Sequence, residues 1–316
     1  MKIKKITTTI ETIPLKTPFI TALRRVDNVE FVRVRIELQS GNLSFGEAPA
    51  TKAITGEDLD LILNSIDSYK ARLIGLSPQE AIAKLDSFKI GSSARAALDM
   101  ALFNILNPLN NKTDKKTAIT ISLGDVSKML ADANIAYTSQ NDILKLKFND
   151  NINHAIEVTK KIKEQNPDAS LLIDANQAWS YKDSITYIDA IKDVGIELIE
   201  QPVKKDELES LKKITEYSDI PIVADESCFT FEDVKVVVEN KIADIINIKL
   251  MKCGGITKAM EILEYCRAKK VPVMMGSMLE GPTSIAYASS LVDAYKDVVK
   301  YVDLDSPLLY KENFKK

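Results

Sequence analysis

Residues 171–202 read LLIDANQAWSYKDSITYIDAIKDVGIELIEQP. A short apolar run ends at Asp174, and a second apolar run ends at Glu200, 26 residues further along the chain. An interval of that length accommodates a strand, a helix and two short loops. We therefore interpret this stretch as one βα unit that leads into the next strand, with a carboxylate at the end of each strand.

The same pattern continues on both sides of this unit. Other apolar runs end, at intervals of 24 to 27 residues, at Lys147, Asp225, Lys249, Gly276 and Asp303. With residues 118–122 as the first strand, the repeat predicts eight parallel strands in an α/β fold, as a (β/α)8-type barrel or its modified (β/α)7β form with seven helices. Chemistry in such barrels takes place at the carboxyl ends of the strands, so the polar residues there are candidate site residues.

The first hundred residues do not follow this rhythm. Their patterns predict strands and helices at 3–12, 31–38, 43–45, from near Thr55, from Ser77 and over 93–106. The polar, proline-containing segment 107–116 separates them from the barrel. We predict an α+β capping domain over residues 1–112 and a barrel over 113–316, and we expect residues 306–316 to return to the capping domain.

Composition excludes several classes of protein. The chain has 316 residues and a formal net charge of −3 without a dominant basic stripe, so we expect no nucleic-acid or membrane partner. The first residues lack an apolar signal core, which predicts a cytoplasmic protein. Three cysteines without a CxxC pair predict free thiols. Because His154 is the only histidine, any proton transfer falls to lysines and carboxylates.

Asp174, Glu200 and Asp225 stand at matched positions of three consecutive units. Each alone could be a turn or capping residue at the start of a loop. Three carboxylates brought together would repel one another unless a cation held them. Oxygen ligands without histidine or cysteine favour Mg²⁺.

Lysines stand on two of the predicted strands. Lys145 and Lys147 point to the same face of the second strand, and Lys249 ends the sixth strand, across the barrel. We expect nearby cations to lower the pKa of these lysines from about 10.4 towards 7, where they can accept and return a proton. We interpret three other lysines as solvated surface groups: Lys241, Lys252 and Lys258.

The order of these motifs resembles the muconate-lactonizing subgroup of the enolase superfamily. The matching motifs are Lys145-Leu-Lys147, Asp174-Ala-Asn-Gln-Ala-Trp179, Glu200-Gln-Pro202, Ala224-Asp-Glu-Ser227 and Lys249-Leu-Met-Lys-Cys-Gly-Gly255. They cover the whole barrel, and the N-terminal segment fits the capping domain of that family. One departure is Ile143, where many relatives have threonine.

The resemblance implies a shared first step. A substrate carboxylate coordinates Mg²⁺, a base removes the α-proton, and the metal stabilises the enediolate. The metal ligands carried over from the family are Asp174, Glu200 and Asp225. The acid/base pair carried over is Lys147 and Lys249, with Lys145 as electrostatic support.

Two features resemble the dipeptide epimerases of this family. Asp303-Leu-Asp305 resembles the pair of aspartates that holds the α-ammonium group of a dipeptide, although both could simply end the strand. Arg24 resembles an arginine that pairs with the side-chain carboxylate of the substrate in epimerases of L-Ala-D/L-Glu. Alternatively, Arg25 takes this role, or Arg24 is a solvated loop residue. Other expected substrate contacts, with no role assigned to the last two, are Thr51, Ile54, Ser277 and Glu280.

The sequence thus predicts a Mg²⁺-dependent dipeptide epimerase acting on L-Ala-D/L-Glu or a similar dipeptide. The resemblance further implies murein-peptide recycling and a homo-oligomer. Alternatives within the superfamily are an N-acylamino acid racemase, an o-succinylbenzoate synthase and a muconate cycloisomerase. A different reaction class would be a Schiff-base aldolase using Lys249, and a further possibility is a non-catalytic binding protein.

Overall fold

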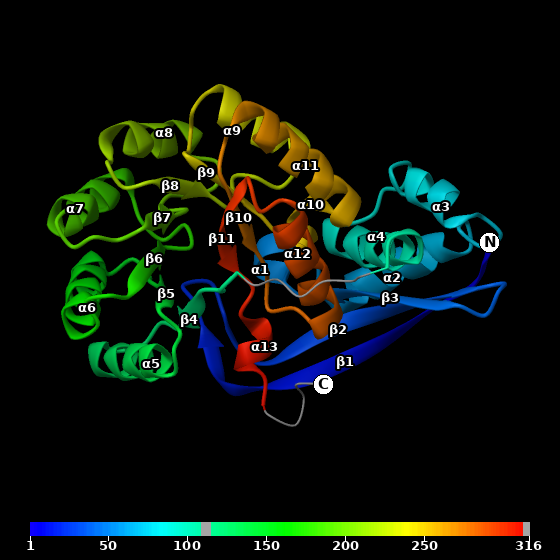
Figure 1. Ribbon diagram of the computed structural model, residues 1–316, viewed down its shortest axis with the longest axis horizontal. Helices are drawn as coiled ribbons and strands as arrows, with labels where there is room; N and C mark the ends of the chain where they lie inside the picture. The colour runs from blue at the N-terminus through cyan, green and yellow to red at the C-terminus, as the bar shows by residue number, and fades with distance from the viewer. Residues whose placement is uncertain (109–114, 312–316) are drawn as a thin grey trace.

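The structure is a computed structural model that describes residues 1–108 and 115–311. Two sheets organise it: an eight-stranded barrel and a three-stranded antiparallel sheet that lies beside the barrel, drawn in blue in Figure 1. The boundary predicted between residues 112 and 113 lies outside the described residues. Within the described ranges, no helix is long and apolar enough to cross a membrane.

The barrel is parallel throughout, and its strands follow one another in sequence order. The strands are β4 (Ile119–Ile121), β5 (Ile143–Lys147), β6 (Ser170–Asp174), β7 (Leu198–Glu200), β8 (Ile222–Ala224), β9 (Ile245–Ile248), β10 (Val273–Gly276) and β11 (Val299–Asp303). The backbone N–H of Ala118 donates to the carbonyl of Val302 (2.8 Å), which joins the first strand to the last. The predicted barrel is confirmed.

Seven helices connect these eight strands in the described chain. They are α5 (Val126–Thr138), α6 (Ile152–Gln165), α7 (Tyr181–Ile191), α8 (Leu208–Tyr217), α9 (Phe231–Glu239), α11 (Ile256–Lys269) and α12 (Pro282–Ala294). Two single-turn helices, α10 (Leu250–Cys253) and α13 (Ser306–Leu309), follow β9 and β11. The arrangement is therefore the (β/α)7β form of the barrel, with one helix fewer than strands.

The alternation of side chains along each strand separates an apolar floor from a polar mouth. The floor is a buried cluster formed by Ala118, Leu172, Leu198, Val223, Ile245 and Met274. On β6 and β7, Asp174 and Glu200 follow Leu172 and Leu198 after two residues, so they point to the same inward face nearer the carboxyl end. The barrel interior thus changes from apolar to charged towards the mouth.

The capping domain combines a sheet with four helices. The elements are β1 (Ile3–Ile20), β2 (Arg25–Leu38), β3 (Leu43–Pro49), α1 (Lys52–Thr55), α2 (Leu59–Lys70), α3 (Pro78–Leu85) and α4 (Ser92–Leu106). The first strand continues to Ile20, well beyond the predicted end, across a register shift between Pro14 and Phe19. The extension matters because it carries the chain to the barrel mouth, where Phe19 lines the candidate site.

Local capping signals explain where the capping helices begin. Ser77 and Glu80 form the predicted capping box at the start of α3. The helix expected from Thr55 instead begins at Leu59, because the carboxylate of Asp58 accepts from the N–H of Leu61 (3.0 Å) and serves as the N-cap. The prediction for that helix start was wrong by one turn.

The C-terminal segment runs back along the capping sheet as far as the structure describes it. Tyr310 forms an antiparallel bridge with Leu15, and the N–H of Lys311 donates to the carbonyl of Pro14 (3.0 Å). The three cysteines are free thiols.

Candidate active site

One cavity lies where the carboxyl ends of the barrel strands meet two loops of the capping domain. Its lining residues include Phe19, Thr21, Leu23, Arg24 and Ile54 from the cap and Thr120, Lys147, Asn176, Glu226, Lys249, Ser277, Met278, Asp303 and Asp305 from the barrel. Most predicted site residues therefore meet at one place. The mixture of lysines, carboxylates and one arginine suits a small zwitterionic ligand that also carries extra negative charge.

Two lysines enter this cavity from opposite sides. Lys147 ends β5, and Lys249 follows β9, four strands away in the ring of eight. Lys147 Nζ lies 2.6 Å from Asp174 Oδ2, and Lys249 Nζ lies 2.6 Å from Asp225 Oδ2. Both side chains are almost fully buried. Two amines on opposite walls can approach opposite faces of one bound carbon atom.

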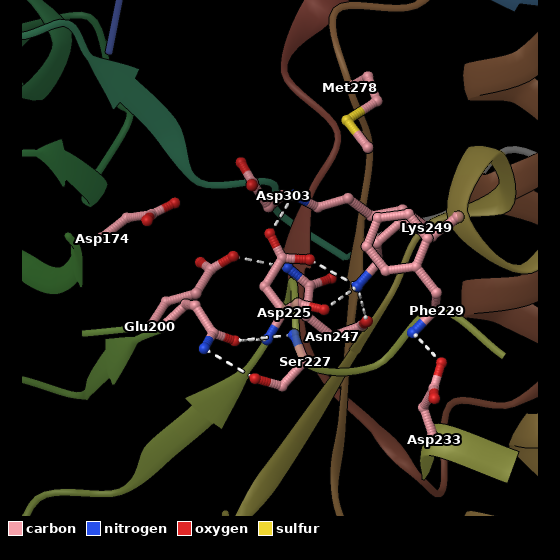
Figure 2. Close-up of polar contacts among 12 residues, drawn as sticks. Asp174, Glu200, Asp225, Ser227, Phe229, Asp233, Asn247, Lys249, Met278 and Asp303 are labelled. Atoms are coloured by element: carbon pink, nitrogen blue, oxygen red, sulfur yellow. Dashed lines mark hydrogen bonds and ion pairs between the residues drawn. The ribbon is translucent and has the colours of Figure 1, made fainter. Parts of the chain in front are cut away.

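The carboxylates Asp174, Glu200 and Asp225, labelled in Figure 2, stand at the ends of successive strands. These strands lie between β5, which carries Lys147, and β9, which Lys249 follows. Asp174 lies opposite Glu200 in the register of β6 and β7. Glu200 Oε1 accepts from Asn247 Nδ2 (2.8 Å), which fixes the orientation of this carboxylate. Their side chains are buried away from solvent, so their charges act on one another through little intervening water.

Lys145 binds the carboxylates together from the barrel interior. Its Nζ lies 2.6 Å from Glu200 Oε2, 3.1 Å from Asp174 Oδ2 and 2.6 Å from Asp303 Oδ2. Leu144 and Leu146 belong to the outer core between strands and helices, so Lys145 takes the inward face as predicted. This ammonium group offsets part of the charge that burial would make costly.

The acidic groups divide into two kinds by their pKa values. Burial and the neighbouring charge of Asp174 raise the pKa of Glu200 to about 7. Burial acts in the same direction on Asp174, but Lys147 and Lys145 outweigh it and lower its pKa to about 2. Burial likewise opposes ionisation of Asp225, yet Lys249 and Lys252 hold its pKa well below the usual range.

The carboxylates of the site raise the pKa of two of these lysines, and the expected lowering by nearby cations, the metal ion included, stays a prediction. Burial lowers the pKa of Lys249, but the carboxylates of Asp225 and Glu200 outweigh it and raise the pKa above its usual value. Lys145 behaves in the same way, because Asp303 and Glu200 face its ammonium group. The closest charged neighbours of these two amines are the protein's own carboxylates.

The carboxylates suit a magnesium ion by their chemistry. In the two described ranges no three acid, histidine or cysteine side chains converge closely enough to enclose a metal ion. The ammonium group of Lys145, however, already lies within 3.1 Å of both Asp174 and Glu200, so a cation occupies the point where two of the carboxylates meet. Hard oxygen donors of this kind are the ligands that Mg²⁺ prefers.

The two strand-ending aspartates also meet at the cavity. Asp303 faces Lys145, and Asp305 Oδ2 accepts from the backbone N–H of Thr120 (2.7 Å). Burial and the nearby charge of Asp303 raise the pKa of Asp305 to about 6. Two carboxylates at one wall attract a cationic group of a ligand.

The arginine predicted in the cap loop points into the same cavity. Arg24 is half-buried, and its Nη1 reaches the carbonyl of Ala50 at 3.5 Å. Across the described chain it has no acidic partner within 4.0 Å, and burial lowers its pKa. A guanidinium group without a carboxylate partner is available to a carboxylate of a ligand.

Two expected substrate contacts do not line the cavity. Thr51 is fully buried, whereas Ile54 of α1 does line the cavity. The carboxyl group of Glu280 accepts from the N–H of Met278 (2.8 Å) and contacts Ser284, so it orders the loop after β10 instead of facing the ligand. Both side chains pack within the wall of the cavity. A sequence position near the mouth does not tell whether a side chain faces the ligand or packs within the wall.

Sequence reasoning missed several residues in and behind the site, three of which have charged or amide side chains. Asn176 and Glu226 line the cavity two residues after Asp174 and one residue after Asp225, and this nearness in sequence was the available signal. Lys252 was interpreted as a surface lysine, and this was wrong: its side chain is only 1% exposed and contacts Asp225. Its Nζ lies 2.6 Å from Asp225 Oδ1.

Comparisons with known proteins agree with this geometry. The chain is 51% identical to the L-amino acid-D/L-Glu epimerase of Sulfurimonas denitrificans, over 99% of this chain and 95% of the relative. It is 38% identical to the L-Ala-D/L-Glu epimerase of Bacillus subtilis, over 98% of this chain and 90% of the relative.

Solved structures share the whole fold. A substrate-liganded complex of the L-Ala-D/L-Glu epimerase from Bacillus subtilis superposes with a TM-score of 0.92 at 37% identity, covering 98% of this chain and 92% of the other. A dipeptide epimerase from Enterococcus faecalis, complexed with Mg and L-Leu-L-Tyr, superposes with a TM-score of 0.92 at 34% identity and the same coverage. Residues 128–315 match the family model described as enolase C-terminal domain-like. The chain therefore belongs to the enolase C-terminal domain-like family.

Proposed function

We propose that this protein is a Mg²⁺-dependent dipeptide epimerase that acts on L-Ala-D/L-Glu or on another L-amino acid joined to D/L-Glu. The observation that carries the proposal is the pair Lys147 and Lys249, which enter one cavity from opposite walls. The same cavity holds two aspartates and an arginine that has no acidic partner among the residues the structure describes. Epimerase names among the curated relatives support the same reading.

The charges of the cavity orient such a substrate. Asp303 and Asp305 would bind its α-ammonium group, and Arg24 would bind the side-chain carboxylate of its glutamate residue. These groups hold the two ends of the dipeptide. The α-carbon of its C-terminal residue then lies between the two lysines.

Asp174, Glu200 and Asp225 would hold Mg²⁺. The ion, when bound, supplies positive charge that offsets the negative charge developing on the substrate carboxylate as the α-proton leaves. Structural neighbours crystallised with Mg and dipeptides support this assignment.

Epimerisation requires one lysine to take the α-proton and the other to return a proton to the opposite face. Lys147 and Lys249 exchange these roles between the two epimers. Because each lysine exchanges its protons with solvent, turnover in D₂O labels the substrate.

Incubation with Mg²⁺ and a set of L,L-dipeptides in D₂O tests the proposal, with α-deuterium read by mass spectrometry. We expect exchange confined to the C-terminal residue, fastest for dipeptides that end in glutamate. Full epimerase turnover by Lys249→Ala would contradict the mechanism. Exchange of N-acylamino acids instead of dipeptides would favour the racemase alternative.

The biological setting is part of the proposal. We infer a role in murein-peptide recycling in the cytoplasm, because L-Ala-D/L-Glu is the substrate class that the site suits. Assembly into a homo-oligomer remains a prediction, and light scattering on the purified protein measures it.

A further inference from the structure

Lys252 lies behind the candidate site, outside the ligand cavity. It belongs to the single-turn helix α10, which follows β9 and ends at Gly254, whose φ of +93° reverses the chain. Its side chain is only 1% exposed. Burying an ammonium group completely costs several kcal/mol unless all its donors are paired, so its partners reveal its role.

The partners of Lys252 use its three N–H donors. Its Nζ lies 2.6 Å from Asp225 Oδ1, 2.6 Å from the carbonyl oxygen of Asp225 and 2.8 Å from the carbonyl oxygen of Asn247. An ammonium group has three donors and no acceptor. Lys252 therefore binds both the side chain and the backbone carbonyl of Asp225. Asp225 and Asn247 are labelled in Figure 2.

Asp225 connects Lys252 to the cavity. Its Oδ1 accepts from Lys252, while its Oδ2 accepts from Lys249 at 2.6 Å. Lys249 lines the cavity and Lys252 does not. Because Lys252 binds both Oδ1 and the backbone carbonyl of Asp225, it fixes the orientation of the carboxylate plane. That orientation determines where Oδ2 can bind the ammonium group of Lys249.

The lysine on the opposite wall has no such direct link. Lys147 pairs with Asp174, which in turn contacts Lys145 on the same strand as Lys147. The two proton-transfer groups belong to one connected network, because Asn247 donates to Glu200 Oε1 (2.8 Å) and Glu200 contacts Lys145. Lys252 reaches Lys249 through one residue, Asp225. It reaches Lys147 only through four residues in turn: Asn247, Glu200, Lys145 and Asp174.

We propose that Lys252 is a positioning residue that, through Asp225, aligns Lys249 for proton transfer on one face of the substrate. This inference rests on the proposed epimerase function. Its signature is asymmetry: loss of Lys252 impairs the exchange that depends on Lys249 and spares the exchange that depends on Lys147. A merely structural role would lower both in proportion.

The experiment measures initial rates of α-deuterium incorporation into L-Ala-L-Glu and L-Ala-D-Glu separately, at Mg²⁺ concentrations shown by titration to be saturating for each variant. Lys249→Ala first identifies the epimer whose exchange depends on Lys249. Lys252→Met keeps length and apolar volume but removes the three donors. Lys258→Met is the matched control, because the two carboxylates that contact Lys258 are about half exposed to solvent and lie outside the cavity.

We expect Lys252→Met to slow exchange of the Lys249-dependent epimer by about 10- to 100-fold more than exchange of the other epimer. Lys258→Met should leave the ratio of the two rates unchanged. Because the ratio comes from one sample, a reduced folded fraction cancels. If Lys252→Met does not fold, Lys252→Arg, which keeps the charge but not the three-way geometry, should shift the ratio in the same direction.

Equal slowing of both epimers, or no slowing, would overturn the assignment of Lys252. A crystal structure of the Lys252 variant provides a readout that needs no substrate: we expect the contact between Lys249 Nζ and Asp225 Oδ2 to be lost, and its retention would also overturn the proposal. Absence of exchange in the unaltered protein would instead contradict the epimerase function, so the two failures are distinguishable.

Discussion

Single charged residues at the cavity decide which ligand it accepts. The cap supplies Arg24 without an acidic partner in the described chain, while the barrel supplies Asp303 and Asp305. Charge-assisted hydrogen bonds are worth about 1.5–3 kcal/mol each. Specificity for the ends of the substrate therefore depends on a few side chains, and the proton transfer depends on others.

Replacing Arg24 by methionine should remove the preference for glutamate at the C-terminal position. We expect the ratio of kcat/KM for L-Ala-L-Glu over L-Ala-L-Gln to fall by about 10- to 100-fold, the equivalent of one lost charge-assisted pair. Arg25→Met, which alters an exposed neighbour, is the control. An unchanged ratio in Arg24→Met would show that another group binds the glutamate side chain.

Glu280 gives the protein a pH-dependent stability. Burial raises its pKa to about 7, against about 4.3 for an exposed glutamate. At low pH, Glu280 is protonated in both the folded and the unfolded protein. As pH rises, the unfolded chain loses this proton first, because its pKa is lower. The free energy of unfolding therefore falls between about pH 4.3 and 7 and is constant above that range. Glu280→Gln mimics the protonated form and should remove this fall.

The check is urea unfolding of both proteins at several pH values. The free energy of unfolding of the unaltered protein should fall by about 3 kcal/mol more than that of Glu280→Gln across this range. Parallel curves for the two proteins would mean that Glu280 titrates normally.

At the scale of elements, two buried carboxylates of the capping domain accept hydrogen bonds from the N-terminal backbone N–H groups of two barrel helices. Asp99 on α4 accepts from the N–H of Thr257 in α11 (3.0 Å), and Glu47 on β3 accepts from the N–H of Thr283 in α12 (3.0 Å). The N-cap residue of α11 is Gly255, where a Cβ would lie 2.5 Å from Asp99 Oδ2. The glycine leaves room for a cap from another domain.

Removal of this tertiary cap should destabilise the protein. Asp99→Ala leaves the N–H of Thr257 without its acceptor and Arg95 without its buried carboxylate partner, so we expect a loss of about 1–3 kcal/mol in urea unfolding. Asp86→Ala removes a more exposed partner of the same arginine and should cost less than about 1 kcal/mol. Equal losses for the two variants would argue against a capping role for Asp99.

One apolar core cluster extends through both the cap and the barrel in the part of the chain that the structure describes. Val34 and Leu98 of the cap belong to the same buried cluster as Leu146 and Leu263 of the barrel. Unfolding either part would expose apolar surface of the other, which opposes independent unfolding. The cap is thus held firmly beside the mouth, and it carries Arg24 in register with the barrel residues.

We therefore expect the cap and the barrel to unfold together. Trp179 is the only tryptophan and lies in the barrel, so its fluorescence reports on the barrel, while far-UV circular dichroism reports on both parts. The two urea transitions should coincide within error. Separate midpoints would show that the cap melts on its own.

Much of the site could be predicted from the sequence because its residues follow the strand repeat. The alternation of apolar and charged residues on each strand determined that Asp174 and Glu200 face the barrel mouth, and the interval between units determined the barrel. Local chemistry also determined the capping box at Ser77. These features depend only on neighbours in the chain, which a sequence contains.

Only the tertiary structure decided what depends on distant contacts. Lys252 resembles a surface lysine in the sequence, but the reversal at Gly254 folds α10 so that its ammonium group reaches Asp225. Glu280 follows a strand end at the barrel mouth, yet its carboxyl group accepts from the N–H of Met278 and contacts Ser284 instead of facing the cavity. The physical reason is that the burial and pairing of a charge depend on residues far along the chain, which strand and helix periodicity does not encode.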